Sequence, residues 1–237
     1  MRAWRAVSAV PEFRSKLLAK REHAMPQAVG PFANLDETAL RGLSPHGAVR
    51  SFAKNAVVVN EGDETDSLFI LLSGRVKAFV GEADGREVVL GSIGTGGCFG
   101  ELVLDGGPRS ASIMTLEPCR FFVIPRGDIE GLLDRNPAFA RQLIHMLIGK
   151  VRGLTRKVLD LALKDVYGRF VKFIDENAIE QDGTRVVPER LTQHDIAARI
   201  GGSREMVSRI VKDLTAGGYI SVEAKHISVH KKLPAQW

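Results

Sequence analysis

The chain of 237 residues has few of the side chains that build disulfide, metal and haem sites, with two cysteines and six histidines. Cys98 and Cys119 are far apart in sequence and have no CxxC or histidine companion at ligand spacing, which argues against disulfides, zinc and iron–sulfur clusters. No histidine falls between Ser51 and Arg126, so a jelly-roll enzyme with a His and Glu metal cluster is not indicated. We therefore expect no metal, no cofactor, no catalytic residues and no enzyme activity.

Long hydrophobic runs are also missing. No segment approaches the roughly 20 apolar residues that span a membrane. Residues 1–25 interrupt their apolar side chains with Arg, Pro and Glu too often for a secretory signal. We read these residues as a basic extension with a short helix around Ser15 to Glu22 and no assigned function. These absences predict a cytoplasmic protein with no membrane partner.

The overall balance of residues is that of a globular protein, with 44% hydrophobic and 26% charged side chains. The length favours two domains. A net charge of +5 is compatible with a nucleic-acid partner. From residue 184 to the end there are nine Lys and Arg against five Asp and Glu, so this segment carries +4 of that total.

The first half of the chain has the pattern of a β-sandwich or barrel. Between Ser51 and Arg126, short segments rich in Val, Ile and Phe alternate with glycines. In "VGEADGREVVL", Asp84-Gly85 lies between two such segments and predicts a hairpin.

A long helical pattern follows, with a heptad seam whose residues alternate spacings of three and four. Its members are Ile144, Leu147, Val151, Leu154, Val158 and Leu161, and it is flanked by Lys150, Arg152, Arg156 and Lys157. Two interpretations stay open: a helix lying on the core of its own domain, or a parallel dimer helix. Asp165 can cap a further helix that runs to about Asn177, which predicts a hinge near Leu163 and Lys164.

Two short helices joined by a glycine turn are predicted from "LTQHDIAARIGGSREMVSRIVKDLTAGGYI". Thr192 and Asp195 resemble a capping box, Gly201-Gly202 breaks the first helix, and Ser203 can cap the second. This is a helix-turn-helix, and the segments "YISVE" and "HISVHKK" can form a two-stranded wing after it. We predict double-stranded DNA as the partner, although Arg204 and Glu205 could instead be a solvated helix start. The predicted DNA-binding residues are Thr192, Gln193, Ser203, Arg204, Glu205, Ser208, Arg209 and Lys225.

The order of these features resembles the CRP/FNR superfamily of bacterial transcription regulators. The resemblance rests on strand-rich segments, "FGEL…PRSAS", the heptad helix and "GGSREMVSRIVKDL", and it covers Gly30 to Lys232. It implies an α+β fold with a cyclic-nucleotide-binding jelly roll at 26–136, a dimerisation helix and hinge at 137–163, and a winged helix-turn-helix at 164–237. It also implies a homodimer paired through the heptad seam, a palindromic TGTGA-like site and RNA polymerase as a partner.

The stretch "FGELVLDGGPRSAS" then has a chemical interpretation as a ligand site. Gly100 would let the backbone approach a ligand, Arg109 offers a bidentate fork to a phosphate, and Glu101 can accept from a sugar hydroxyl. The resemblance favours cAMP as the effector. The predicted ligand-binding residues are Gly100, Glu101, Leu102, Arg109, Ser110 and Thr155.

Met206 replaces a family threonine among the predicted DNA-reading residues, where we expect phosphate contacts to differ more than base contacts. Two other departures from the family pattern leave alternatives for the ligand. The loop between Glu101 and Arg109 is one residue shorter than usual, and Leu154 replaces the first of two hydroxyl residues that contact adenine. Thr155 keeps the second hydroxyl. The alternatives are a regulator that responds to cyclic di-GMP, and a ligand-independent regulator in which Glu101 and Arg109 form a structural ion pair.

Overall fold

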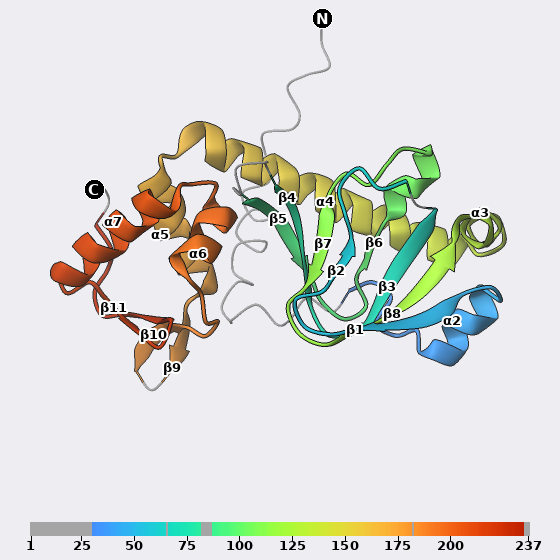
Figure 1. Cartoon of the computed structure of the whole chain (residues 1–237), viewed down its shortest axis with the longest axis horizontal. Coiled ribbons are helices and arrows are strands. Elements are labelled where there is room, and N and C mark those ends of the chain that lie inside the picture. The colour runs from blue at the N-terminus through green and yellow to red at the C-terminus, as the bar shows by residue number, and fades with distance from the viewer. Residues whose placement is uncertain (1–29, 65, 82–86, 182, 235–237) are drawn as a thin grey trace, which may run out of the picture.

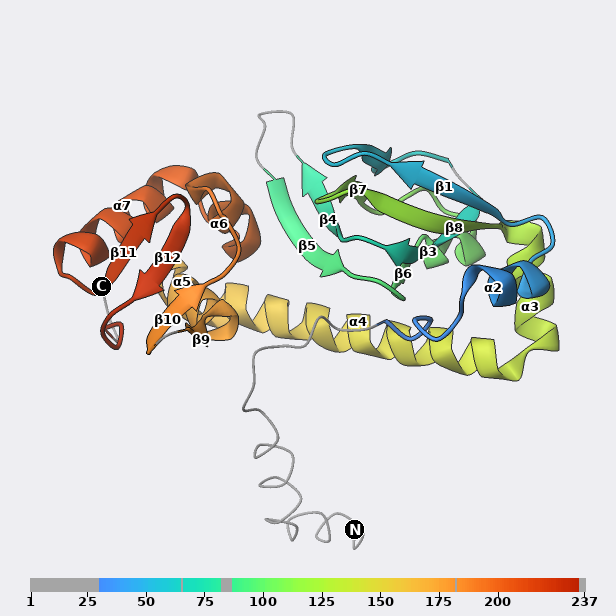
Figure 2. The ribbon, with the colours of Figure 1, turned by 90° about the horizontal axis from the view of Figure 1, so that it is seen from below.

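A computed structural model describes residues 30–64, 66–81, 87–181 and 183–234. A strand-rich body and a smaller C-terminal domain are joined by one long helix (Figures 1 and 2). The basic extension at 1–25, its expected helix at Ser15 to Glu22 and the Asp84-Gly85 turn lie outside the described residues.

The body is a sandwich of two antiparallel four-stranded sheets, with strand orders β1-β8-β3-β6 and β2-β7-β4-β5. The strands are β1 (Ala48–Phe52), β2 (Val57–Val59), β3 (Ser67–Ser73), β4 (Val76–Gly81), β5 (Glu87–Ile93), β6 (Cys98–Phe99), β7 (Ser112–Thr115) and β8 (Cys119–Pro125).

Strand β8 is buried on both faces, which explains its continuous apolar sequence. Phe121 and Val123 belong to the cluster between the two sheets, whereas Phe122 and Ile124 belong to a second cluster beneath the helices. Successive side chains of a strand point to opposite faces, so one strand serves two cores.

The outer face of the β1-β8-β3-β6 sheet packs against helical elements through this second cluster. They are α2 (Glu37–Leu43), the 3₁₀ helix η1 (Glu101–Asp105), α3 (Arg126–Arg135) and the first part of α4 (Pro137–Leu163). Asn136 caps α4 by accepting a hydrogen bond from the Phe139 amide at 3.0 Å, and Pro137 occupies its first turn. Of the helices in the described chain, none is long and apolar enough to cross a membrane.

The heptad seam lies on α4 and most of it faces away from the jelly-roll core. Val151 and Val158 are 62% and 63% exposed, and Ile144, Leu154 and Leu161 are about half exposed. The interpretation that the seam lies on its own domain's core is therefore wrong for these five residues. The seam residue Leu147 is half-buried and packs against the second cluster, the one beneath the helices.

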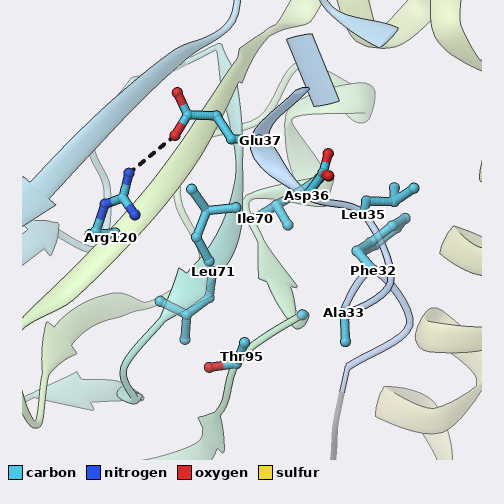
Figure 3. Close-up of a pocket in the computed structure, with 11 residues that line it drawn as sticks. Phe32, Ala33, Leu35, Asp36, Glu37, Ile70, Leu71, Thr95 and Arg120 are labelled. Carbon is cyan, nitrogen blue, oxygen red and sulfur yellow. Dashed lines mark hydrogen bonds and ion pairs between the residues drawn. The ribbon is translucent and has the colours of Figure 1, made fainter. Parts of the chain in front are cut away.

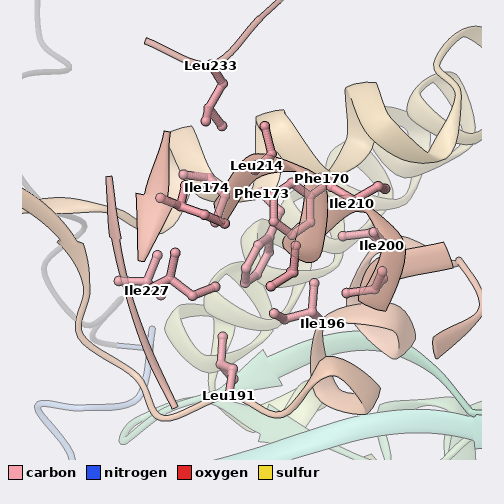
Figure 4. Close-up of a cluster of buried hydrophobic side chains, with 14 of the residues drawn as sticks. Phe170, Phe173, Ile174, Leu191, Ile196, Ile200, Ile210, Leu214, Ile227 and Leu233 are labelled. Atoms are coloured by element: carbon pink, nitrogen blue, oxygen red, sulfur yellow. The ribbon is translucent and has the colours of Figure 1, made fainter. Parts of the chain in front are cut away.

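The C-terminal domain is a winged helix-turn-helix with its own hydrophobic core (Figure 4). It contains α5 (Val166–Asn177), β9 (Ile179–Gln181), β10 (Thr184–Val187), α6 (Gln193–Ile200), α7 (Arg204–Ala216), β11 (Ile220–Glu223) and β12 (His226–Val229). The expected wing hairpin is present as β11 and β12, but it belongs to a four-stranded sheet of order β11-β12-β10-β9. Sequence patterning did not reveal β9 and β10, which have three and four residues.

The two domains also touch away from α4. Helix α6 lies beside strand β5, as both ribbon views show (Figures 1 and 2). Arg75 approaches Glu189 of the C-terminal domain at 3.9 Å between Nη2 and Oε1. Glu189 is also held by a bidentate contact with Arg199 at 2.7 and 2.8 Å.

Candidate ligand site and nucleic-acid interface

The predicted ligand-binding segment, residues 100–110, is the ligand cassette, and it begins directly after β6 ends at Phe99. Gly100 adopts a left-handed conformation, with φ 86° and ψ 14°, and turns the chain into η1. This conformation is unfavourable for residues with a Cβ, which explains the glycine in local terms. Glu101 is the first residue of η1, so the turn at Gly100 places a carboxylate at the start of the cassette.

Arg109 packs directly against Gly100 and is 7% exposed. A Cβ atom at Gly100 would lie 2.3 Å from Arg109 Nη1 and 2.6 Å from the Ser67 carbonyl oxygen. Arg109 Nη2 donates to that same carbonyl at 2.7 Å. The glycine therefore makes room for the arginine, in addition to the predicted approach of a ligand.

Glu101 is paired with a residue that the sequence placed only at the flank of the seam. Lys150 Nζ lies 2.8 Å from Glu101 Oε1, and the Glu101 side chain is 9% exposed. Both residues are described, and no ion pair joins Glu101 to Arg109, so the expected structural Glu101–Arg109 pair is not formed. A ligand-independent regulator stays an alternative. Helix α4 therefore reaches the cassette through Lys150.

Two buried polar atoms of this cassette have no hydrogen-bond partner: Glu101 Oε2 and Arg109 Nε. Burial lowers the pKa of the Arg109 guanidinium, while the carboxylates of Glu101, Asp63 and Asp66 act in the opposite direction. An arginine keeps its charge under such conditions. Because unsatisfied buried groups are rare in proteins and cost about 1–3 kcal/mol each, this pair is typical of a site that binds a polar molecule.

The other predicted ligand residues are more exposed. Leu102 is 43% exposed on η1, and Ser110 is exposed next to Arg109. Thr155 is exposed on α4, and its hydroxyl donates to the Val151 carbonyl at 3.0 Å. Gly100, Glu101 and Arg109 are thus brought together, but Thr155 lies on the seam face and does not join them within one chain.

A second lysine of α4 also turns toward its own jelly roll. Lys157 Nζ donates to the carbonyls of Val89 and Leu90 in β5 at 2.9 and 2.7 Å. Burial lowers the pKa of this ammonium group. Lys150 and Lys157 are one heptad apart and so share one side of the helix. That spacing was the signal in the sequence that could have assigned them to the jelly roll.

A separate hollow of about 260 Å³ lies between the segment before α2 and strand β3 (Figure 3). Its rim carries the Glu37–Arg120 ion pair, with Nη2 and Oε2 3.1 Å apart. None of the predicted ligand-binding residues lines this hollow.

The predicted DNA-reading residues lie at the N-terminal half of α7. Ser203 caps α7 by accepting from the Met206 amide at 3.2 Å, and Thr192 and Asp195 form the capping box of α6. Val207, Ile210, Val211 and Leu214 are buried in the domain core, as the pattern predicted. The side chains of Arg204, Glu205 and Arg209 are exposed and that of Ser208 is half-buried.

Three separate segments meet around this helix start. Thr192, Gln193, His194 and Arg204 line a hollow of about 360 Å³ where α6 and α7 begin. The backbone carbonyl of Lys225, in the β11–β12 turn, accepts from the Leu191 amide at 3.0 Å and so ties the wing to the start of α6. Two helix N-termini and basic side chains together suit the phosphates of a nucleic acid.

Met206 is half-buried and packs against the domain core. The methionine that stands here in place of the family's threonine therefore contacts the domain core beside the predicted DNA-reading residues.

Two family models match the chain, one in each domain. Residues 49–136 match the family model of the cyclic nucleotide-binding domain, and residues 168–232 match that of the Crp-like helix-turn-helix domain. The fold and these two matches define a DNA-binding transcription regulator with a cyclic nucleotide-binding domain.

The relatives specify the family. The chain is 31% identical over 205 residues to a CRP-like cAMP-activated global transcriptional regulator of Mycobacterium tuberculosis, covering 84% of this chain and 92% of that protein. It is 29% identical over 198 residues to the cAMP-activated global transcriptional regulator Vfr of Pseudomonas aeruginosa, covering 79% and 91%. The solved structure of CLP, the c-di-GMP responsive global regulator of Xanthomonas campestris, has a TM-score of 0.72 and 27% identity, covering 82% and 98%. This protein belongs to the CRP/FNR family of transcription regulators, and the family and fold class predicted from the sequence are confirmed.

The packing of Gly100 on Arg109 leads to a stability prediction. Gly100→Ala should lower the free energy of unfolding by about 2–4 kcal/mol, because left-handed strain is added to a clash with Arg109. Gly106 is the matched control: its φ is also positive, at 79°, but the nearest atom to an added Cβ is 3.6 Å away. Gly106→Ala should therefore cost only about 1–2 kcal/mol. Equal losses in denaturant unfolding would contradict the close packing.

Proposed function

We propose that this regulator binds a cyclic nucleotide in the Gly100–Ser110 cassette and, as a homodimer, reads a palindromic TGTGA-like DNA site. cAMP is the favoured ligand. RNA polymerase stays the predicted protein partner through which such a regulator acts.

The observation that carries the ligand proposal is that the side chains of Glu101 and Arg109 are both buried and that each keeps one polar atom without a hydrogen-bond partner. A phosphate can accept from the guanidinium, and a ribose hydroxyl can donate to the carboxylate. The free atoms Arg109 Nε and Glu101 Oε2 supply one donor and one acceptor in the same cassette. Lys150 adds a cation at Glu101 and links that carboxylate to α4.

The identity of the ligand is supported by the relatives that carry cAMP in their names, at 31% and 29% identity. Cyclic di-GMP is the second candidate because of Leu154, which replaces a family hydroxyl and is 49% exposed on α4. The structural similarity to CLP also favours this alternative.

The dimer proposal rests on the composition of the exposed seam. Ile144, Val151 and Val158 occupy one heptad position, and Leu147, Leu154 and Leu161 occupy the other. β-Branched residues at the first position and leucine at the second favour two parallel strands. Ile148 and Leu159, which are 45% and 51% exposed, widen this apolar stripe. A second copy of the chain is the occupant that matches such a stripe.

The ligand assignment is tested by titrating the protein with cAMP and with cyclic di-GMP in a calorimeter. Arg109→Lys should weaken binding by about 30- to 1,000-fold, equivalent to about 2–4 kcal/mol, because the bidentate contact to a buried phosphate is lost. The matched control is Arg120→Lys, an exposed arginine on β8, which should bind as wild type does. Wild-type affinity in Arg109→Lys would refute the site. If cyclic di-GMP gives a heat of binding and cAMP gives none, cyclic di-GMP replaces cAMP as the favoured ligand.

The dimer is tested by light scattering at micromolar concentration. The wild type should have twice the chain mass of 25.9 kDa. Val151→Lys should reduce this to one chain mass, because two lysines would face each other across the seam. Val57→Lys is the control, since Val57 is an exposed apolar residue of β2 outside the seam. A wild-type monomer with and without ligand would end this proposal.

The reading proposal is tested by selection from random DNA duplexes. Arg204 and Arg209 can each bind a guanine, and Glu205 can accept from a cytosine amino group. Arg209→Ala should cost about 1–3 kcal/mol on the selected site and relax the preference at one guanine. Lys225→Ala should instead weaken all sequences similarly and reduce the salt dependence. Unchanged preference in Arg209→Ala, or half-sites without paired G·C positions, would mean that α7 does not read DNA in this way.

A further inference from the structure

Arg169 lies where the long helix, the hinge and the helix-turn-helix meet. It belongs to the first turn of α5, and its backbone amide donates to the Asp165 carbonyl at 3.1 Å. Its guanidinium bonds to residues 164, 200 and 201, and it belongs to neither predicted site. The sequence pattern gave no reason to select it.

The guanidinium of Arg169 donates to three main-chain carbonyls from two helix ends. Nη1 bonds to the carbonyl of Lys164 at 2.6 Å, at the end of α4. Nε and Nη2 bond to the carbonyls of Ile200 and Gly201 at 2.7 and 3.0 Å, at the end of α6. The last carbonyls of a helix lack partners within it and carry partial negative charge, so a cation is favoured at both ends.

The glycine turn after α6 also packs tightly on the hinge. A Cβ at Gly201 would lie 3.0 Å from Leu161 of α4, and one at Gly202 would lie 2.9 Å from Val166 of α5. The Gly202 amide donates to the Ala197 carbonyl at 3.0 Å, which closes the end of α6. The turn that leads into α7 is therefore seated on the last seam residue of α4.

A cluster of charged side chains joins α4 to α5 beside the hinge at Leu163 and Lys164. The Asp160 carboxylate accepts from Lys172 of α5 and pairs with Lys164 at 3.0 Å. The side-chain hydrogen bond from Lys172 is the main reason why the pKa of Asp160 is below its usual value. Movement at the hinge must break these contacts or carry the helix-turn-helix with it.

We propose that Arg169 is the positioning residue that couples the end of the long helix to the recognition helix α7. The proposal rests on the proposed function, because it assumes that the state of α4 controls DNA affinity. Arginine suits this role because one planar fork reaches three carbonyls. Lysine would keep the charge but offer a single nitrogen, and the link between the two helix ends would be lost.

The first test does not depend on any ligand. Hydrogen exchange of peptides covering 200–207 should be about tenfold faster in Arg169→Lys than in wild type, since loss of hydrogen bonds from a charged donor destabilises the turn. The control is Arg185→Lys, in which a half-buried arginine that pairs with Asp175 at 3.1 Å is replaced. Exchange in 200–207 should not change in the control. Unchanged exchange in Arg169→Lys would overturn the proposal.

The second test measures affinity for the selected DNA site with and without cAMP, or with cyclic di-GMP if that is the ligand that binds. In wild type and Arg185→Lys the ligand should raise DNA affinity. In Arg169→Lys, this ratio should fall by about tenfold or to unity, while ligand affinity in the jelly roll is retained. A preserved ratio, with DNA affinity reduced equally in both states, would mean a merely structural role and would refute the coupling. A wild type without any ligand effect would refute ligand control instead, and hydrogen exchange would still decide whether Arg169 fixes the turn.

Discussion

Helix α4 has two different sides along one length, one bonded to the jelly roll and one apolar and exposed, and the rest of the molecule depends on this arrangement. One side carries Lys150 and Lys157, which bond to the jelly roll at Glu101 and at the carbonyls of β5. Another side exposes the apolar seam represented by Val151 and Val158. An α-helix places residues one heptad apart on the same side, so these two functions are kept apart by sequence spacing alone.

The chemistry of the ligand cassette follows from the burial of Arg109 and from the contact of Glu101 with Lys150 of α4. Arg109 is buried against Gly100 and the Ser67 carbonyl, where its charge is removed from most of the solvent. In such surroundings hydrogen bonds to a phosphate are stronger than in water, and an unpaired polar atom is costly. At the other end of α4, carbonyl groups that no helix can satisfy are collected by Arg169. Both arginines therefore act where backbone groups and burial create a need for a cation.

Patterns that repeat within one element were predictable from the sequence. The capping box at Thr192 and Asp195, the cap at Ser203 and the buried face of α7 were all found by local rules. The exposed seam was also found, although its two interpretations could be separated only by measuring burial. Short strands such as β9, which has three residues, offer too few positions for a period to be recognised.

The sequence by itself indicated a strand-rich first half, a long helix with an apolar seam and a helix-turn-helix, because each depends on periodic burial or on capping within a continuous segment. The fold class and the order of the domains came from the family resemblance that these motifs carry. The tertiary structure decided the partners of individual charged side chains. Glu101 bonds to Lys150 rather than to Arg109, and Gly100 makes room for an arginine. The three carbonyls that meet Arg169 come from positions up to 37 residues apart (from Lys164 to Gly201). Such contacts depend on how whole elements pack against one another, and spacing along the chain does not encode that geometry.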